Sequence, residues 1–219
     1  MSTPRDKKLP YEFITLSGLI GAGKTTLATA LSEKLQVPLY LEKVENQTLL
    51  KLFYSDMSKY GFALQVDLLS NRLAEQHNIT WSFQGAVQDR SFYEDLAFAR
   101  TLTELGHMDE VQLAVYEKLY DTVFRTMRHP TCVVFLGVSP TTALERIKQR
   151  GRENEQGITL EYLTLLQKHY RTLLDDLSRQ LRVIYIDWSQ YKDETRVIEA
   201  LEKELFVTQQ ITELTVEQD

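Results

Sequence analysis

The sequence has little cysteine, no long apolar run and no excess of positive charge. Its 219 residues include one cysteine, Cys132, so no intramolecular disulfide can form and we expect a reducing compartment. No apolar run approaches the ~18 residues of a membrane span, and the opening MSTPRDKKLP lacks the hydrophobic segment of a secretory signal. These absences predict a cytoplasmic protein with no membrane partner.

The charge balance is slightly acidic. There are 31 acidic and 25 basic side chains, which gives a formal net charge of −6. Because nucleic acids favour a positive protein face, this balance argues against a nucleic-acid partner. Length and composition predict a single globular domain over residues 1–219, with flexible ends at 1–11 and 207–219.

Short apolar segments alternate with longer stretches of helical spacing. The segments rich in β-branched and aromatic residues are EFITLS (12–17), PLYLE (38–42), GAVQD (85–89), TCVVFLGV (131–138) and RVIYID (182–187). This alternation predicts an α/β protein with a doubly wound, five-stranded parallel sheet. The apolar runs in the first, fourth and fifth segments are typical of strands covered on both faces.

The stretch GLIGAGKTT, residues 18–26, predicts a phosphate site. It has the spacing Gly-x4-Gly-Lys-[Ser/Thr] and lies between a predicted strand and a predicted helix, 25–35. Glycines let backbone N–H groups turn toward phosphate oxygens, Lys24 reaches the terminal phosphates, and Thr25 offers a hydroxyl to Mg²⁺. The predicted nucleotide-binding residues of this loop are Gly18, Gly21, Ala22, Gly23, Lys24, Thr25 and Thr26.

A phosphate loop alone does not distinguish hydrolysis, group transfer and sensing. The sequence has no guanine-reading Asn/Thr-Lys-x-Asp motif after a strand, which argues against a GTPase. The third predicted strand ends in Asp89-Arg90-Ser91, whereas motor-type ATPases usually have Asp-Glu there. Both observations favour transfer of phosphate to a small acceptor.

Two carboxylates are expected at the carboxyl ends of strands, where open α/β sheets bind ligands. Glu42 ends the segment PLYLE and could take the proton from an attacking hydroxyl, although a solvated glutamate is the commoner role at such a position. Asp89 could hold Mg²⁺ and Arg90 could fix an oxygen, although an ordinary ion-paired loop would look the same.

A third candidate is the arginine-rich stretch RIKQRGRENEQG. Arg146 and Arg150 share a helical face, and with Arg152 they can close on triphosphate oxygens. Glycines bracket the charged loop between Arg150 and Gly157, which is typical of a mobile lid. A kinase needs such a lid to exclude water from the transfer, so the loop favours a kinase over a hydrolase.

In combination these motifs resemble the deoxynucleoside kinases. The resemblance runs from Phe13 to Ile186 and also includes Tyr54, Gln65 with Arg72, and Asp95 after Asp89-Arg90-Ser91. It implies a P-loop kinase fold with an arginine-rich lid. It also implies ATP-dependent, Mg²⁺-assisted phosphorylation of a deoxynucleoside 5′-hydroxyl.

The resemblance assigns roles to the catalytic and sugar-binding residues. Glu42 would be the base on the 5′-hydroxyl, Arg90 would help to position it, and Lys24 would contact the phosphates. Tyr54 and Glu155 would hold the sugar 3′-hydroxyl.

The resemblance also predicts which residues read the base. Gln65 and Arg72 share one face of a predicted helix over 60–75, and together with Asp95 they would contact the base edge. An amide offers paired donor and acceptor groups, and an arginine and aspartate can pair while each still faces a ligand. Phe98 would stack on the base or belong to the core.

Several properties stay open at this stage. Lys43 replaces a proline that the family often has after the glutamate, while the short stretch from Glu42 to Tyr54 is similar to bacterial-type members. By the same resemblance, the Arg72 and Asp95 pair favours a purine deoxynucleoside or deoxycytidine over thymidine, and the bacterial-like first half favours deoxyadenosine, then deoxyguanosine or deoxycytidine. The resemblance further implies a homodimer through helices at 60–75 and 109–128, and makes feedback by a deoxynucleoside triphosphate plausible. A nucleoside monophosphate kinase and a non-catalytic nucleotide sensor remain alternatives.

Overall fold

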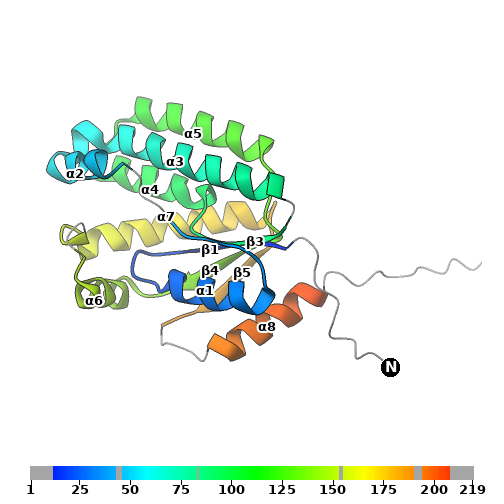
Figure 1. The fold of residues 1–219 in the computed structure, drawn as a ribbon. Coiled ribbons are helices and arrows are strands. Elements are labelled where there is room, and N and C mark those ends of the chain that lie inside the picture. The colour runs from blue at the N-terminus through cyan, green and yellow to red at the C-terminus, as the bar shows by residue number, and fades with distance from the viewer. Residues whose placement is uncertain (1–11, 43–45, 83, 153–154, 190–193, 208–219) are drawn as a thin grey trace, which may run out of the picture.

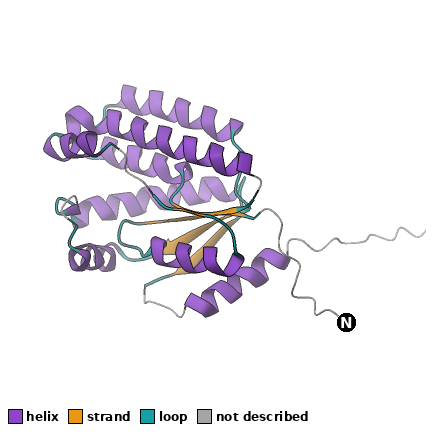
Figure 2. Ribbon diagram, viewed as in Figure 1, coloured by secondary structure: helices purple, strands orange, loops and turns teal. Residues whose placement is uncertain are grey.

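Five parallel strands form the centre of the protein (Figures 1 and 2). The computed structural model describes residues 12–42, 46–82, 84–152, 155–189 and 194–207. The strands are β1 (Phe13–Gly18), β2 (Leu39–Tyr40), β3 (Ala86–Asp89), β4 (Cys132–Gly137) and β5 (Val183–Asp187). Their order is β2-β3-β1-β4-β5 and every neighbouring pair is parallel, which confirms the predicted sheet.

Helices cover both faces of this sheet. Their bounds are α1 (Lys24–Leu35), α2 (Gln47–Ser55), α3 (Met57–Ser82), α4 (Asp95–Glu104), α5 (Glu110–Thr126), α6 (Pro140–Arg150), α7 (Leu160–Ser178) and α8 (Glu194–Val207). Figure 1 shows α1 and α8 on one face, and α3, α4, α5 and α7 on the other. A short 3₁₀ helix, η2 (Phe92–Glu94), leads into α4.

Burial explains why the central strands are almost wholly apolar. All residues of β1 and β4 are buried, because helices cover them on both sides. The prediction for the fifth segment was wrong, since β5 forms an edge of the sheet and is only partly covered. Tyr185 on that strand keeps 64% of its surface exposed.

Two element boundaries differ from those expected. The strand predicted over residues 38–42 is reduced to Leu39–Tyr40, so Glu42 lies beyond the ladder. The helix predicted over 60–75 is the middle of the longer α3, and its buried face includes Gln65, Leu69 and Arg72 as the spacing predicted. Lys43 and the ends expected to be flexible, 1–11 and 208–219, lie outside the described residues, and Val207 is the last residue of α8.

Local signals fix the helix that carries the lid arginines. The Ser139 hydroxyl accepts a hydrogen bond from the Thr142 N–H at 3.1 Å, and Pro140 occupies the first turn, so α6 begins there. Gly151 ends the helix with a φ of 66°, a left-handed conformation that glycine adopts without strain. Gly151 therefore marks a defined end of the helix that carries Arg146 and Arg150.

None of the described helices combines the length and the apolar character that crossing a membrane requires.

Candidate active site

The phosphate loop joins β1 to α1 and is held by close packing. Gly21 has a φ of 81°, and a Cβ atom there would lie 2.6 Å from the Ala143 carbonyl oxygen and 2.9 Å from Cγ1 of Ile147. Both neighbours belong to α6. The loop can therefore approach the lid helix only because residue 21 has no side chain.

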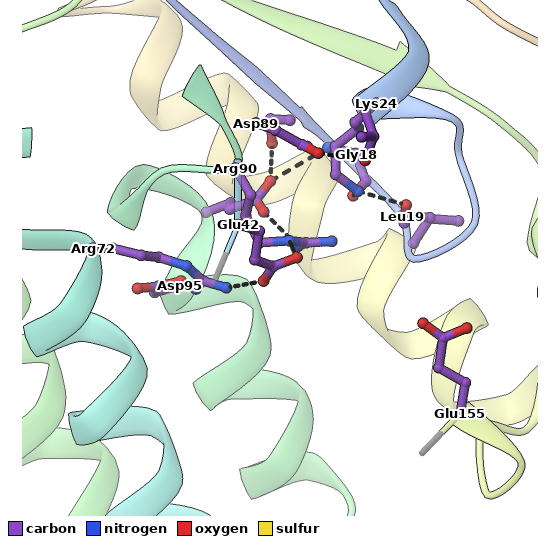
Figure 3. A network of polar contacts seen from close by, with 12 residues as sticks. Gly18, Leu19, Lys24, Glu42, Arg72, Asp89, Arg90, Asp95 and Glu155 are labelled. Carbon is purple, nitrogen blue, oxygen red and sulfur yellow. Dashed lines mark hydrogen bonds and ion pairs between the residues drawn. The ribbon is translucent and has the colours of Figure 1, made fainter. Parts of the chain in front are cut away.

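Lys24 is the first residue of α1 and its side chain is buried. Its Nζ donates hydrogen bonds to the carbonyl oxygens of Gly18 and Leu19, both at 3.0 Å (Figure 3). Burial, with a smaller effect of Arg90, lowers the Lys24 pKa from 10.5 to about 8 against the opposing effect of Glu94, Asp89 and Glu42. The ammonium is thus held at the phosphate loop mainly by backbone oxygens.

Thr25 and Asp89, the two residues predicted to hold Mg²⁺, are hydrogen-bonded to each other. The Thr25 hydroxyl donates to Oδ2 of Asp89, while Oδ1 of Asp89 is buried and has no hydrogen-bond partner among the described residues. A hydroxyl and a carboxylate oxygen fit the preference of Mg²⁺ for oxygen ligands. Across the described part of the chain, no three His, Cys, Asp or Glu side chains cluster as metal ligands, so phosphates and water would complete the coordination.

A chain of ion pairs links the candidate catalytic base to the candidate base readers (Figure 3). Glu42 accepts from Nη2 of Arg72 at 2.6 Å and from Nε of Arg90 at 3.0 Å. Arg72 also pairs through Nη1 with the fully buried Asp95. The Arg72 guanidinium therefore joins Glu42, the predicted base on the 5′-hydroxyl, to Asp95, a predicted contact of the nucleobase.

The two arginines determine the ionisation of Glu42. Burial by itself would raise the pKa of this carboxyl, but Arg90 and Arg72 outweigh it and lower the pKa from 4.5 to about 2. A third of the Glu42 side chain stays exposed toward the cavity described below. The carboxylate is consequently charged at neutral pH and accessible to a ligand.

Arg90 has an unusual backbone and a crowded side chain. Its φ is 70°, which non-glycine residues rarely adopt, and its N–H donates to the Leu16 carbonyl at 3.0 Å. The guanidinium pairs with Glu42 and Glu94 and lies 5.1 Å from the centroid of the Phe98 ring. Such contacts are what hold a strained backbone conformation in place.

A cavity of about 690 Å³ brings the predicted residues together. It lies between the phosphate loop, Glu42 and the lid. Its lining includes residues predicted to bind the nucleotide and residues predicted to bind the deoxynucleoside. The predicted residues that line it are Gly21, Gly23, Lys24, Thr25, Thr26, Glu42, Tyr54, Gln65, Arg72, Asp89, Arg90, Phe98, Arg146, Arg150, Arg152 and Glu155. Gly18, Ala22 and Asp95 are not in its lining, and Asp95 is reached through Arg72.

Phe98 belongs to the core and also lines the cavity. Its side chain is part of the hydrophobic core, in edge contact with Tyr170 at 6.1 Å between ring centroids. It also lines the cavity and lies against the guanidinium of Arg90. A stacking contact with a base stays a prediction.

The lid arginines are engaged within the protein. Arg150 forms a forked pair with Glu155 at 2.5 and 2.6 Å, and Arg152 lies 3.6 Å from the same carboxylate. Arg146 donates to the backbone carbonyls of Ala22, Trp188 and Ser189 at 3.1 to 3.3 Å. Arg146 therefore ties the lid helix to the phosphate loop, and phosphate contacts of the three arginines stay predictions.

Three residues beneath the phosphate loop were not predicted from the sequence: Ser17, Glu94 and Tyr170. Glu94 accepts hydrogen bonds from the Ser17 hydroxyl, from the Gly18 N–H at 3.3 Å and from Arg90. The Tyr170 hydroxyl donates to the Gly18 carbonyl at 3.3 Å. Glu94 follows Arg90 by four residues and directly precedes Asp95, which is the one signal that could have drawn attention to it.

The fold and site together define a P-loop kinase that works on a small acceptor. Residues 14–211 match the family model "Deoxynucleoside kinase". A deoxyadenosine kinase from Dictyostelium discoideum is 44% identical over 198 residues, which cover 90% of this chain and 81% of that protein. The chain belongs to the deoxynucleoside kinase family.

Solved structures agree with this assignment. A deoxyadenosine kinase from M. mycoides, solved with the products dCMP and dCDP bound, has a TM-score of 0.78 at 28% identity and covers 89% of this chain and 98% of its own. The same enzyme with dATP bound has a TM-score of 0.76, again at 28% identity, over 88% of this chain and 98% of its own.

The close packing at Gly21 predicts a specific loss of stability. Gly21→Ala adds a strained φ, which costs about 1 kcal/mol, and a steric clash, which typically costs about 1–3 kcal/mol more. Gly106→Ala is the matched control, because Gly106 has a φ of 75° and no atom within 4 Å of the added Cβ. Urea unfolding of both variants should show the larger loss for Gly21→Ala, and equal losses would contradict the packing argument.

Proposed function

We propose that this enzyme transfers the γ-phosphate of ATP to the 5′-hydroxyl of a deoxynucleoside, with deoxyadenosine preferred. The observation that carries the proposal is the position of Glu42. An ionised carboxylate, held by two arginines, lies in one cavity with the phosphate loop and with Gln65 and Arg72. A nucleoside whose base contacts these two side chains would place its sugar between them and the phosphate loop.

Glu42 would accept the proton of the 5′-hydroxyl. Because Arg90 and Arg72 lower its pKa to about 2, Glu42 is ionised at neutral pH but weakly basic. A weak base suits phosphoryl transfer, in which the transition state is loose and the protein acts mainly by positioning and electrostatics. Glu42 would therefore orient the hydroxyl first and take its proton late in the transfer.

The donor phosphates would be held from several sides. The backbone N–H groups of the loop and the Lys24 ammonium would contact the phosphates, and Arg150 and Arg152 would close over them. Thr25 and Asp89 would hold Mg²⁺, which neutralises charge on the phosphate oxygens when bound. Tyr54 and Glu155 line the same cavity and would bind the sugar 3′-hydroxyl.

Buried acceptors support a preference for a base that carries an amino group. Asp95 has no exposed surface, and neither its Oδ2 nor Oε1 of Gln65 has a hydrogen-bond partner among the described residues. An unpaired buried acceptor costs roughly 1–3 kcal/mol, which a donor on the ligand would recover. Adenine and cytosine present an exocyclic amino group where guanine and thymine present a carbonyl, and the D. discoideum and M. mycoides relatives are deoxyadenosine kinases.

The proposal predicts the outcome of a substrate panel. The four deoxynucleosides and their monophosphates are assayed with ATP and Mg²⁺, and deoxyadenosine should give the highest kcat/KM. Glu42→Gln should lower kcat by ~10² or more with little loss of ATP binding, because the proton acceptor is removed while the phosphate loop is intact. Activity on monophosphates alone would indicate a nucleoside monophosphate kinase, and ATP binding without product would indicate a sensor.

The base-reading role of Asp95 gives a second prediction. Asp95→Asn replaces a pure acceptor by a group that also donates, so kcat/KM for deoxyadenosine should fall by ~10 to 100-fold. The loss for thymidine, which presents a carbonyl at the equivalent edge, should be smaller. The measurement is the ratio of the two kcat/KM values before and after the change, and an unchanged ratio would remove Asp95 from base recognition.

Feedback by a deoxynucleoside triphosphate is part of the proposal. Such a ligand carries both a base and a triphosphate, and the cavity joins the candidate base readers to the phosphate loop. The M. mycoides enzyme has been solved with dATP bound, which supports a triphosphate ligand for this chain as well.

A cytoplasmic location is proposed too, and the single buried cysteine, Cys132, fits a reducing compartment.

We also propose a homodimer through α5. Val111, Val115 and Leu119 are spaced by four residues and keep 73%, 54% and 39% of their surfaces exposed. They form an apolar stripe along one side of a solvent-facing helix, and burying it against a second copy would remove it from water.

Changing the centre of the stripe tests the dimer. Val115→Asp should shift the protein from dimer to monomer in analytical ultracentrifugation, because a charge would be buried at the interface. Ala114→Asp is the control, because it adds the same charge at an exposed position about 100° around the helix from Val115. A monomeric wild-type protein would refute the dimer.

A further inference from the structure

Glu94 is a buried carboxylate that touches both halves of the proposed site. Only 1% of its surface is exposed. Its Oε1 accepts from Nη1 of Arg90, and its Oε2 accepts from the Ser17 hydroxyl and from the Gly18 N–H at 3.3 Å. The two oxygens of one carboxylate therefore serve two different parts of the chain.

The contacts of Oε2 hold the start of the phosphate loop. Ser17 and Gly18 are the last residues of β1, where the loop leaves the sheet. The Gly18 carbonyl in turn accepts from Lys24 at 3.0 Å and from the Tyr170 hydroxyl at 3.3 Å. With Glu94 on its N–H, both polar groups of the Gly18 peptide backbone are fixed.

The contact of Oε1 acts on the acceptor side. Arg90 uses Nη1 for Glu94 and Nε for Glu42, so Glu94 constrains the guanidinium that orients the candidate base. The Tyr170 hydroxyl accepts from the same Nη1 at 3.2 Å. Burial alone would lower the pKa of Arg90, but Glu42 and Glu94 raise it well above its usual value, so the arginine stays charged.

We propose that Glu94 is a positioning residue that sets the location of Glu42, through Arg90, relative to the phosphate loop. The inference rests on the proposed function, in which Glu42 activates the hydroxyl and the loop holds the donor. Transfer needs the attacking oxygen and the phosphorus in line at near contact, and a misplacement of about 1 Å can cost ~10² in rate. A single carboxylate bonded to both sides links their positions more directly than separate supports would.

The chemistry of the site requires a carboxylate of this length. Glutamine keeps the shape, but one of its two terminal groups is a donor and would face either Arg90 or the Ser17 and Gly18 donors. Aspartate keeps the charge and is one methylene shorter, so it cannot keep both sets of contacts at their present distances. Both changes should therefore uncouple the two halves without removing a group that contacts substrate.

The experiment measures kcat, KM for deoxyadenosine and ATP affinity for Glu94→Gln. We expect kcat to fall by ~10-fold or more while KM and ATP affinity change by less than ~3-fold, because the substrate contacts are intact. Gln76→Leu is the control, since Gln76 is fully buried and bonds Tyr93 and the Arg128 carbonyl away from the cavity. It should lose stability but keep kcat.

A double-mutant cycle separates positioning from general damage. If Glu94 acts through Glu42, the variant Glu94→Gln/Glu42→Gln should be no slower than Glu42→Gln alone. Ser17→Ala removes one contact of Glu94 without leaving a charge unpaired, and it should lower kcat less than Glu94→Gln does. If Glu94→Gln fails to fold, the kcat of Ser17→Ala still tests the positioning role of Glu94.

The possible failures are distinguishable. An inactive wild-type enzyme on every deoxynucleoside would refute the proposed function itself. An active wild type whose Glu94→Gln variant loses stability but keeps kcat, as the Gln76→Leu control should, would refute only the positioning role. Losses that multiply in the cycle with Glu42→Gln would also refute it, because Glu94 would then act independently of Glu42.

Discussion

The pairing of Arg90 with two carboxylates is the interaction on which the rest of the site depends. A buried guanidinium is costly unless its charge and its hydrogen-bond donors are satisfied. Glu42 and Glu94 satisfy them, Glu42 at the cavity and Glu94 at the start of the phosphate loop. Removing either partner would leave charge uncompensated in a crowded part of the protein, so the three residues form one unit.

The parallel sheet explains why this unit can form. All five strands point the same way, so the loops that follow β1, β2 and β3 open at one edge. These three loops supply the phosphate loop, Glu42 and Arg90, in that order. Gly18 and Arg90 meet in this way although they are 72 positions apart in the chain. Helix α3 then adds Gln65 and Arg72 from its buried face. The fold brings these residues together, and the ion pairs orient their side chains.

Much of this could be predicted from local sequence. The phosphate loop has its own spacing, β1 and β4 have continuous apolar runs, and helical periodicity put Gln65 and Arg72 on one face. Each of these signals is contained in a short stretch of the sequence. Glu42 was identified as a candidate for the same reason, because it follows a strand, although that strand is shorter than expected.

Other features could not be predicted, because they depend on contacts between distant segments. Glu94 is unremarkable in sequence, and its importance comes from Ser17 and Gly18, which lie 77 and 76 positions away. Helical spacing grouped Arg146 with Arg150, but it does not contain the bonds that Arg146 donates to the backbone carbonyls of Trp188 and Ser189. The exposure of Tyr185 likewise follows from strand order, which periodicity does not contain.

The pair between Arg150 and Glu155 has a consequence for turnover. The lid residue Arg150 is paired with a carboxylate five residues further along the chain. Under the proposed function, a nucleotide that binds Arg150 would have to displace that carboxylate, so part of its binding energy would be used within the lid and its affinity would be reduced. The same carboxylate is ready to recapture Arg150 once the γ-phosphate has left, which would favour release of the spent nucleotide. In an enzyme of this kind, an internal competitor of this sort would shorten the residence time of the product.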